Sequence, residues 1–182
     1  VGIMTNPKRD MDLEYTKNVI GFLQDKTEIY IEDEIIPFLP ADHGFTLLTA
    51  QNAKELDFVV ILGGDGTILD SLALLDYGAV PLLGINLGRL GFLAAAERHD
   101  WQYYLDLALK GEYKIEQRSL LAMEHMDNKR IALNDVVIFR ACEENGVISL
   151  DVYIDNVLLA EYFADGIIIS TPTGSTAYSL AA

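Results

Sequence analysis

The sequence is poor in cysteine and contains no long apolar run. One cysteine, Cys142, occurs in 182 residues, which excludes an intramolecular disulfide and a cysteine-cluster zinc site. A lone cysteine fits a reducing compartment, where its simplest role is that of a small buried hydrophobe. No apolar segment reaches the ~20 residues of a membrane span, and no basic-then-apolar leader precedes Val1. We therefore expect a soluble, cytoplasmic protein without a membrane partner.

Basic residues are also scarce, with 13 Lys and Arg against 28 Asp and Glu, a net charge of -15 and a pI near 4.4. Such a charge repels polyanions and argues against nucleic-acid binding, which needs a basic surface. A small phosphate-bearing ligand is still compatible, because a few backbone amides and local cations can outweigh the average charge. What the chain does have is 51% hydrophobic residues, enough for a globular core and too many for a disordered chain.

Segments typical of strands and helices alternate through the first half of the chain. Residues 58–62 and 81–85 are continuous apolar runs, as expected of strands that helices cover on both faces. Because the connections are short, we predict a three-layer α/β domain with a parallel sheet over residues 1–111. The predicted strands are 1–4, 28–31, 58–62 and 81–85, and the predicted helices are 12–25, 67–77 and 100–109.

The second half contains short strand candidates with no helix between them until residues 175–182. Asp155-Asn156 is typical of a hairpin turn. These features predict an all-β, sandwich-like domain over residues 112–182. The chain starts in a predicted strand and stops in a predicted helix, so we expect a trimmed chain whose β domain is incomplete. The predicted strands are 118–126, 131–140, 147–154, 157–163 and 166–170.

A glycine-rich turn at residues 63–67 joins a predicted buried strand to the following helix. Ligands of open α/β sheets bind at the carboxyl ends of strands, and the start of a helix presents free amides and a positive dipole end to phosphate. The chain has neither a Gly-Lys-Ser/Thr loop nor a GxGxxG motif, so this is not a Walker A loop or a standard dinucleotide fingerprint. The predicted phosphate-binding residues are Gly63, Gly64, Gly66 and Thr67.

Asp65 places a carboxylate in the same turn, which is unfavourable beside phosphates unless it takes part in the chemistry. It can accept a proton from an attacking hydroxyl or contact a magnesium ion. The alternative is that Asp65 merely caps the helix, although the surrounding glycines serve no capping purpose. Lys8-Arg9 and Arg89 are the cations best placed to offset phosphate charge, with a solvated surface position as the alternative for each.

Polar residues gather in three places in the second half. Seven of the ten residues 170–179 carry a hydroxyl, more than helix capping needs, and Tyr178 adds a ring that can stack on a base. Asn134-Asp135 interrupts an apolar strand and needs polar partners if buried, unless it forms a turn at a strand edge. Asp165 precedes the 166–170 strand, either as a plain turn residue or as a carboxylate for an amide or hydroxyl.

Four segments resemble, in order, the motifs of the NAD kinases: GGDGT at 63–67, NLGRLGFL at 86–93, ALNDVVI at 132–138 and DGIIISTPTGSTAYSLAA at 165–182. GGDGT alone also occurs in diacylglycerol kinases, sphingosine kinases and phosphofructokinases, whereas STPTGSTAYSL is specific. The resemblance spans essentially all 182 residues. It implies an α/β domain and a β domain that close over NAD, and transfer of the γ-phosphoryl group of ATP, or of polyphosphate, to the 2'-hydroxyl of the adenosine ribose.

The resemblance also implies roles for individual residues. Asp65 corresponds to the acceptor of the ribose hydroxyl proton, and Asn134-Asp135 to an Asn and acid that hold the nucleotide. Some relatives carry a basic residue two positions before the counterpart of Asp165, where this chain has Phe163, so that charge contact is lost or supplied elsewhere. The implied NAD-binding residues are Asp65, Gly66, Asn134, Asp135, Asp165, Thr176, Ala177, Tyr178, Ser179, Leu180 and Ala181.

The implied substrates are NAD and ATP or polyphosphate, with Mg²⁺ or another divalent cation as cofactor. No metal ligands can be assigned from the sequence. Family members commonly form oligomers, so we expect a homodimer or homotetramer. Two alternatives stay open: a lipid kinase of the diacylglycerol or sphingosine type that shares the GGDGT loop, and a non-catalytic relative that binds nucleotide without transferring phosphate.

Overall fold

The computed structural model describes residues 1–39, 44–78, 80–89, 91–140 and 146–182, so Cys142 lies outside the described residues. These residues divide into two compact units, Val1–Ile115 and Glu116–Ala182, whereas the sequence analysis placed the division between residues 111 and 112. No helix in the described ranges is both long and apolar enough to cross a membrane.

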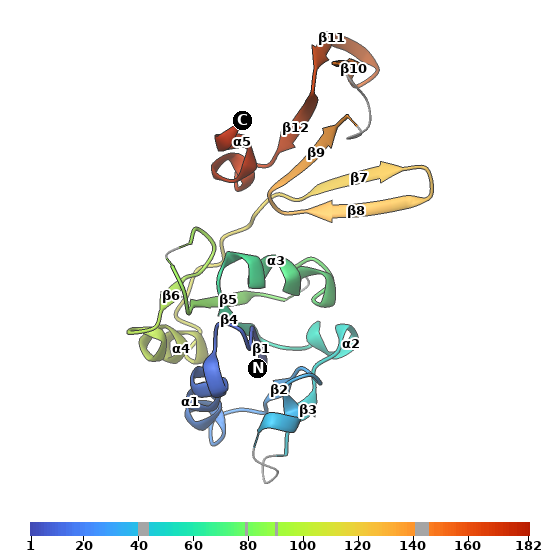
Figure 1. The fold of residues 1–182 in the computed structure, drawn as a ribbon. Helices are drawn as coiled ribbons and strands as arrows, with labels where there is room; N and C mark the ends of the chain where they lie inside the picture. Colours follow the sequence, from blue (N-terminus) through green and yellow to red (C-terminus); the bar gives the residue numbers. More distant parts are fainter. Residues whose placement is uncertain (40–43, 79, 90, 141–145) are drawn as a thin grey trace. The chain divides into compact units, whose positions relative to one another are not determined.

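The N-terminal unit is built on a six-stranded, fully parallel sheet in the order β3-β2-β1-β4-β5-β6 (Figure 1). The predicted α/β architecture is therefore confirmed. The two-residue strands β3 and β6 and the short helix α2 carry too little pattern to be predicted. The strands are β1 (Gly2–Thr5), β2 (Tyr30–Ile31), β3 (Thr46–Leu47), β4 (Val59–Gly63), β5 (Leu82–Asn86) and β6 (Ala96–Glu97), and the helices are α1 (Glu14–Leu23), α2 (Ala50–Ala53), α3 (Asp65–Leu74) and α4 (Trp101–Leu109).

Alternate residues of β4 belong to two separate hydrophobic clusters, which explains its uninterrupted apolar sequence. Val60 and Leu62 pack in the cluster that includes buried residues of α1 and α4. Val59 and Ile61 pack in the other cluster, which includes Ala53 of α2 and Ile68 of α3. Helices therefore cover both faces of the sheet, as the three-layer prediction requires.

The first helix starts from a buried carboxylate. Asp10 is 1% exposed and follows the loop after β1. Its two oxygens accept hydrogen bonds from the Tyr15 amide at 2.9 Å, the Thr16 amide at 2.8 Å and the Thr16 hydroxyl at 2.6 Å. A buried carboxylate is stable only with such partners. Asp10 therefore joins the end of β1 to the first turn of α1, which was predicted over 12–25 but runs from Glu14 to Leu23.

The C-terminal unit consists of three two-stranded antiparallel sheets, β7-β8, β9-β12 and β10-β11, with no helix between the described strands. Asp155 and Asn156 have φ of 49° and 64°, the left-handed backbone of a tight hairpin turn between β10 and β11. The predicted β structure is confirmed. The strands are β7 (Leu121–His125), β8 (Asn128–Ala132), β9 (Asp135–Phe139), β10 (Ile148–Ile154), β11 (Val157–Ala164) and β12 (Gly166–Ser170).

Two boundaries in this unit differ from the prediction. The single strand predicted over 131–140 is two strands, because the chain leaves β8 after Ala132 and re-enters β9 at Asp135. The helix predicted over 175–182 is a 3₁₀ turn, Gly174–Thr176, followed by the one-turn helix α5, Tyr178–Ala181. Ala177 breaks the helix with φ and ψ of -96° and -127°.

Candidate functional site

The glycine turn lies at the point where the order of the parallel sheet reverses. From β1 the chain goes outward to β2 and β3, then returns to β4 and continues to β5 and β6 on the other side. In open α/β sheets, ligands bind outside the carboxyl ends of the strands at such a switch point. Gly63 ends β4, Gly64 is the N-cap of α3, and Asp65 is its first residue. The helix starts two residues before its predicted start, which places Asp65 in the first helical turn.

The loop after β1 is tied to this glycine turn by Asn6 and Thr67. The Asn6 amide N–H donates to the carbonyl of Leu62 at 3.0 Å, and its side-chain Nδ2 donates to Oγ1 of Thr67 at 3.3 Å. Oγ1 of Thr67 also accepts from the Gly64 amide at 3.4 Å. A Cβ atom on Gly63 would overlap with the Thr67 side chain, so only glycine allows this close approach. The sequence analysis missed Asn6, although a polar residue directly after a buried strand was a usable signal.

Asp65 does not cap its own helix. Oδ2 of Asp65 accepts from the Phe92 amide at 2.8 Å, and Oδ1 accepts from the Leu93 amide at 3.1 Å. The N-cap position belongs to Gly64, so the capping alternative for Asp65 is wrong. The carboxylate instead connects the first turn of α3 with the loop after β5, which contains the second of the four motifs, NLGRLGFL at 86–93.

Gly91 is needed for this contact, because a Cβ atom at position 91 would overlap with the Asp65 carboxylate. We expect Gly91→Ala to push the loop away from Asp65 and to lower turnover by about tenfold, on the scale of one lost hydrogen bond of about 1.4 kcal/mol. Steady-state kinetics of the complete gene product would measure this. Gly21→Ala is the matched control, since nothing lies within 4 Å of a Cβ at position 21. Unchanged turnover in Gly91→Ala would show that the contact between Asp65 and the loop after β5 does not affect catalysis.

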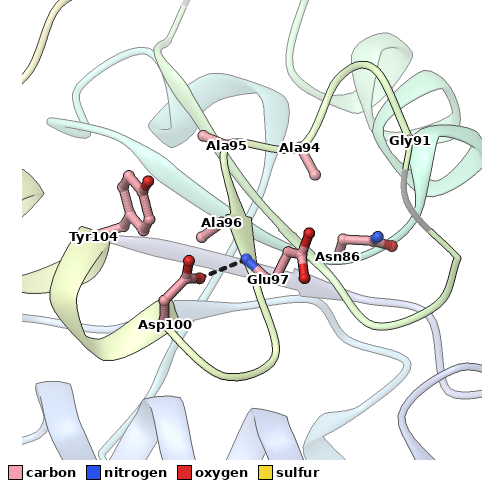
Figure 2. A pocket seen from close by; sticks show the side chains of 8 residues that line it. All are labelled: Asn86, Gly91, Ala94, Ala95, Ala96, Glu97, Asp100 and Tyr104. Atoms are coloured by element: carbon pink, nitrogen blue, oxygen red, sulfur yellow. Dashed lines mark hydrogen bonds between the residues drawn. The ribbon is translucent and has the colours of Figure 1, made fainter.

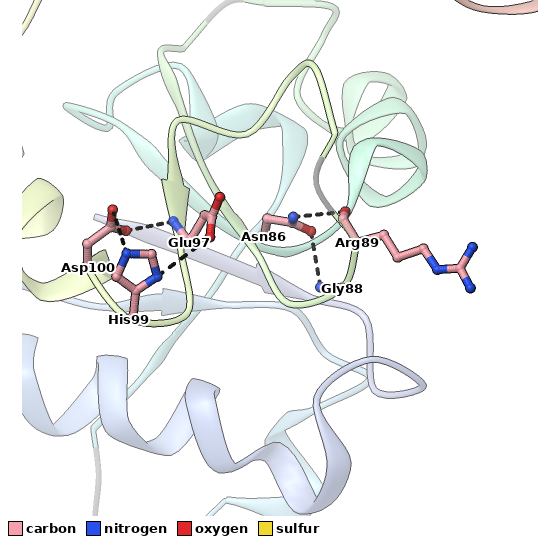
Figure 3. Close-up of polar contacts among 6 residues, drawn as sticks. All are labelled: Asn86, Gly88, Arg89, Glu97, His99 and Asp100. Carbon is pink, nitrogen blue, oxygen red and sulfur yellow. Dashed lines mark hydrogen bonds and ion pairs between the residues drawn. The ribbon is translucent and has the colours of Figure 1, made fainter.

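Asn86 shapes the loop after β5 and was not singled out by the sequence analysis. It pairs with Gly63 in the sheet register and is 4% exposed. Its Nδ2 donates to the carbonyl of Arg89 at 2.8 Å, and its Oδ1 accepts from the Gly88 amide at 3.1 Å, as Figure 3 shows. The Leu87 amide donates to the carbonyl of Gly63 at 2.7 Å. The turns after β4 and β5 are thus bonded to each other.

A pocket of about 200 Å³ opens beside this loop at the carboxyl ends of β5 and β6. Its walls include polar groups, and the Glu97 amide donates to Oδ1 of Asp100 at 2.7 Å within it. Within the described ranges, no three His, Cys, Asp or Glu side chains gather as a metal site, in this pocket or elsewhere. Figure 2 shows the lining residues Asn86, Gly91, Ala94, Ala95, Ala96, Glu97, Asp100 and Tyr104.

Glu32 lies at the same edge of the sheet, directly after β2. Its Oε2 accepts from the Thr5 amide at 3.1 Å. Burial raises the pKa of the Glu32 carboxyl above its ordinary value, the Thr5 hydrogen bond lowers it in part, and the Glu34 charge raises it. The acidic stretch Glu32-Asp33-Glu34 thus begins with a half-buried carboxyl.

This shift predicts a pH-dependent stability difference. A carboxyl with a raised pKa in the folded protein destabilises the fold once it ionises, at pH values above the ordinary pKa of glutamate. We therefore expect Glu32→Gln to melt at a higher temperature than the wild type at pH 7. The difference should shrink as the pH falls through the Glu32 pKa and vanish below the ordinary value, near 4.5. Thermal melts across this pH range test it, and a difference that does not change with pH would contradict it.

In the C-terminal unit the structure brings Asn134-Asp135 next to the hydroxyl-rich segment. The Thr171 amide donates to the carbonyl of Asn134 at 2.8 Å, and the Thr171 hydroxyl donates to the carbonyl of Leu133 at 2.5 Å. Asp135 pairs with Ser170 across β9 and β12. A Cβ atom on Gly174 would overlap with the Asn134 backbone, so the two loops touch. Asn134 therefore lies in the turn before β9, as the strand-edge alternative expected.

The remaining predicted residues lie at two different places. Thr176 to Ala181 follow directly from this contact, in the 3₁₀ turn and α5. Asp165 lies at the opposite end of β12, about 17 Å away by the rise of five strand residues. There its Oδ1 accepts from Nε of Arg140 at 2.9 Å. Within this unit, Asp165 is not brought together with Asn134-Asp135.

The chain matches known proteins over its whole length. Family models of the ATP-NAD kinase N-terminal domain and the ATP-NAD kinase C-terminal domain match residues 1–113 and 133–182. The NAD kinase of Thermoanaerobacter sp. (strain X514) is 38% identical over 100% of this chain and 66% of its own length. The NAD kinase of Clostridium botulinum (strain ATCC 19397 / Type A) is 37% identical over 100% and 63%. The chain thus spans slightly less than two thirds of the length of these curated relatives.

Solved structures show the same similarity. The crystal structure of yeast NADH kinase complexed with NADH has a TM-score of 0.83 and 27% identity, over 99% of this chain and 59% of that one. The crystal structure of an NAD kinase from Archaeoglobus fulgidus in complex with ATP has a TM-score of 0.72 over 100% of this chain and 64% of that one. At 22% identity, the second likeness concerns the fold alone.

Proposed function

Because the chain belongs to the NAD kinase family, we propose that the complete gene product phosphorylates NAD at the 2'-hydroxyl of its adenosine ribose, with ATP or polyphosphate as donor. The observation that carries this proposal is the glycine turn at residues 63–67, held at the switch point of a parallel sheet with a carboxylate in the first turn of α3. Such a turn suits a phosphate group, and the carboxylate suits a hydroxyl that must lose a proton.

In this proposal the backbone of the glycine turn holds the donor phosphates. The first amides of α3 have no acceptors within the helix, and glycine at positions 63, 64 and 66 lets a phosphate come close to them. The Thr67 hydroxyl and Asn6 fix the shape of the turn, because their hydrogen bonds join it to the loop after β1. Phosphoryl transfer depends mainly on such positioning and on neutralised charge.

Asp65 is the proposed proton acceptor. The hydrogen bonds from the Phe92 and Leu93 amides fix the orientation of its carboxylate. Carboxylate oxygens have about four lone-pair directions, so each oxygen can accept a further hydrogen bond from a ribose hydroxyl while the loop contact persists. Asp65 then orients the hydroxyl and receives its proton as the oxygen attacks the γ-phosphorus of ATP, while the bond from that phosphorus to the β–γ bridging oxygen breaks and ADP leaves.

Mg²⁺ or another divalent cation is the proposed cofactor. Magnesium is usually held by one or two carboxylates together with substrate phosphates rather than by an all-protein cage. Asp65 is the carboxylate in the glycine turn and would contribute such a ligand, and the described residues contain no larger acidic cluster that would form a cage. When bound with ATP, the ion offsets the charge of the phosphates.

The C-terminal unit contributes the proposed nucleotide contacts. We propose that Asn134-Asp135 and the segment from Thr176 to Ala181 bind NAD, because Thr171 and Gly174, which lead into that segment, contact Asn134. Asp165 is proposed to contact NAD as well, on the motif resemblance alone. Location in the cytoplasm and a homodimer or homotetramer complete the proposal.

The test is a panel of acceptors and donors with the complete gene product. NAD, NADH and diacylglycerol are each offered with ATP or polyphosphate, and the phosphorylated product is identified by mass spectrometry. The proposal expects a 2'-phosphorylated nicotinamide dinucleotide and no phosphorylated lipid. Phosphorylated diacylglycerol would support the lipid-kinase alternative instead. Binding of NAD without any phosphorylated product would support a non-catalytic relative.

A further inference from the structure

Three of the 13 basic residues fall in the two loops that flank the glycine turn. Lys8 and Arg9 follow β1, and Arg89 follows β5. Because β4 lies between β1 and β5 in the sheet, these loops stand on either side of the turn at residues 63–67. In a chain of net charge -15, this is a local concentration of positive charge at the carboxyl edge of the sheet.

Arg9 is the cation that lies beside both of these loops. A Cβ atom at position 88 would lie 3.1 Å from Nη1 of Arg9 and 3.8 Å from its Cζ, so the guanidinium lies against the backbone of Gly88. Arg9 starts in the loop after β1 and reaches the loop after β5. Its side chain therefore extends from the loop after β1 toward the loop after β5, and β4 lies between these two strands in the sheet.

The other two cations are less well placed. The Arg89 side chain extends away from the loop after β5, as Figure 3 shows, while its backbone carbonyl accepts from Asn86. Lys8 is exposed, and its backbone amide donates to Oδ1 of Asn6 at 3.0 Å. Of these three cations, Arg9 is the one whose side chain reaches from the loop after β1 to the backbone of the loop after β5.

The guanidinium of Arg9 has no ion-pair partner among the residues that the structure describes. Arg9 is exposed, so it is free to meet a ligand from solvent. Arginine presents a planar fork of donors that matches the oxygens of phosphate. An arginine beside the glycine turn, without an ion-pair partner among the described residues, is therefore placed to bind a phosphate chain.

We propose that Arg9 contacts the polyphosphate chain of the phosphoryl donor, and that Gly88 is glycine because the guanidinium needs the space above its backbone. The inference rests on the proposed function and deepens it: it assigns the donor-phosphate charge contact to Arg9. Because the proposed contact is with the donor and not with NAD, replacing Arg9 should change the KM for ATP and leave the KM for NAD nearly unchanged.

The kinetic test compares Arg9→Ala, Arg9→Lys and wild type in the complete gene product. Arg9→Ala raises KM for ATP about tenfold or more, the scale of a charge-assisted hydrogen bond, with KM for NAD changed less than about twofold. Arg9→Lys recovers part of the loss, because it restores the charge without the planar fork. Lys54→Ala is the matched control: it also removes one cation, but Lys54 precedes β4 and pairs with Asp76 on the surface. Equal KM for ATP in Arg9→Ala and wild type would overturn the proposal.

Gly88 supplies a second, independent variant. The Cβ of Gly88→Ala would come closest to the flexible end of Arg9, at 3.1 Å from Nη1, and would lie in ordinary contact with Oδ1 of Asn86 at 3.8 Å, so we expect the fold to be retained while the guanidinium shifts. Gly88→Ala raises KM for ATP several-fold, and adding it to Arg9→Ala has no further effect, because both changes act on one contact. Additive effects of the two changes would contradict the assigned role of Gly88.

Direct binding separates this inference from the proposed function. Inorganic tripolyphosphate is titrated calorimetrically into wild type and Arg9→Ala, with and without Mg²⁺. Binding that weakens in Arg9→Ala supports the phosphate contact even if the wild type forms no NADP, in which case the proposed activity alone fails. Equal tripolyphosphate binding by both proteins overturns the role of Arg9 whatever the activity.

Discussion

Replacing Asp65 with Asn is expected to lower turnover by about 10² or more while leaving NAD binding nearly unchanged. The scale is that of losing a general base, since Asn is similar in shape but cannot accept the hydroxyl proton. Asn also keeps one oxygen for the Phe92 or Leu93 amide, so the loop after β5 loses one of two hydrogen bonds. Steady-state kinetics and calorimetric titration with NAD measure the two effects separately.

The controls distinguish chemistry from loop positioning. Asp70→Asn makes the same change at an exposed position of α3 and should leave turnover unchanged. Gly91→Ala displaces the loop but keeps the carboxylate, so its loss should be about tenfold smaller than that of Asp65→Asn. Near-normal turnover in Asp65→Asn would refute the role as proton acceptor. Equal losses in Asp65→Asn and Gly91→Ala would reduce Asp65 to a residue that positions the loop.

Removing the buried carboxylate of Asp10 should lower the free energy of unfolding by about 3 kcal/mol. Asp10→Ala leaves the Tyr15 and Thr16 amides and the Thr16 hydroxyl without their acceptor. Each unsatisfied buried donor costs about 1–3 kcal/mol, reduced where water can enter the space left behind. Because Asp10 joins β1 to α1, the loss should appear as unfolding of the N-terminal unit.

The measurement is urea unfolding followed by the fluorescence of Trp101, the single tryptophan of this chain. Trp101 is 7% exposed and packs edge-on against Phe22 of α1, with ring centroids 5.8 Å apart, so its signal reports the helix that Asp10 anchors. Asp25→Ala, at an exposed position after α1, is the control and should change stability by less than about 0.5 kcal/mol. Equal urea midpoints for Asp10→Ala and Asp25→Ala would show that the hydrogen bonds of Asp10 contribute little to the free energy of unfolding.

Much of the fold could be predicted because its signals are local. The run FVVIL followed by two glycines predicted both a strand buried on two faces and the position of the glycine turn, and β4 and α3 meet there. The hairpin at Asp155-Asn156 was likewise predictable, since Asp and Asn tolerate positive φ. The edge strands β3 and β6 are two residues long and have no period to detect.

The sequence singled out candidate site residues, but it could not show which of them contact each other. Asp65 and the loop at Phe92 are 27 residues apart, and their hydrogen bond depends on β4 and β5 being neighbours, which no local pattern shows. The same holds for Arg9 and Gly88, which meet only because of the strand order. The predicted helix over 175–182 failed because Ala177 leaves the helical region of backbone space, which an alanine does not signal.

We propose that this acidic chain binds phosphate at the glycine turn of residues 63–67, and that the Asp65 carboxylate in this turn accepts the proton of a nucleotide hydroxyl. The most direct measurement is NADP formation by the complete gene product from NAD and ATP in the presence of Mg²⁺, followed with an NADP-specific dehydrogenase. We expect NADP to accumulate in a 1:1 ratio with the ATP consumed. Saturable NAD binding without NADP, with ATP and with polyphosphate, would contradict the claim.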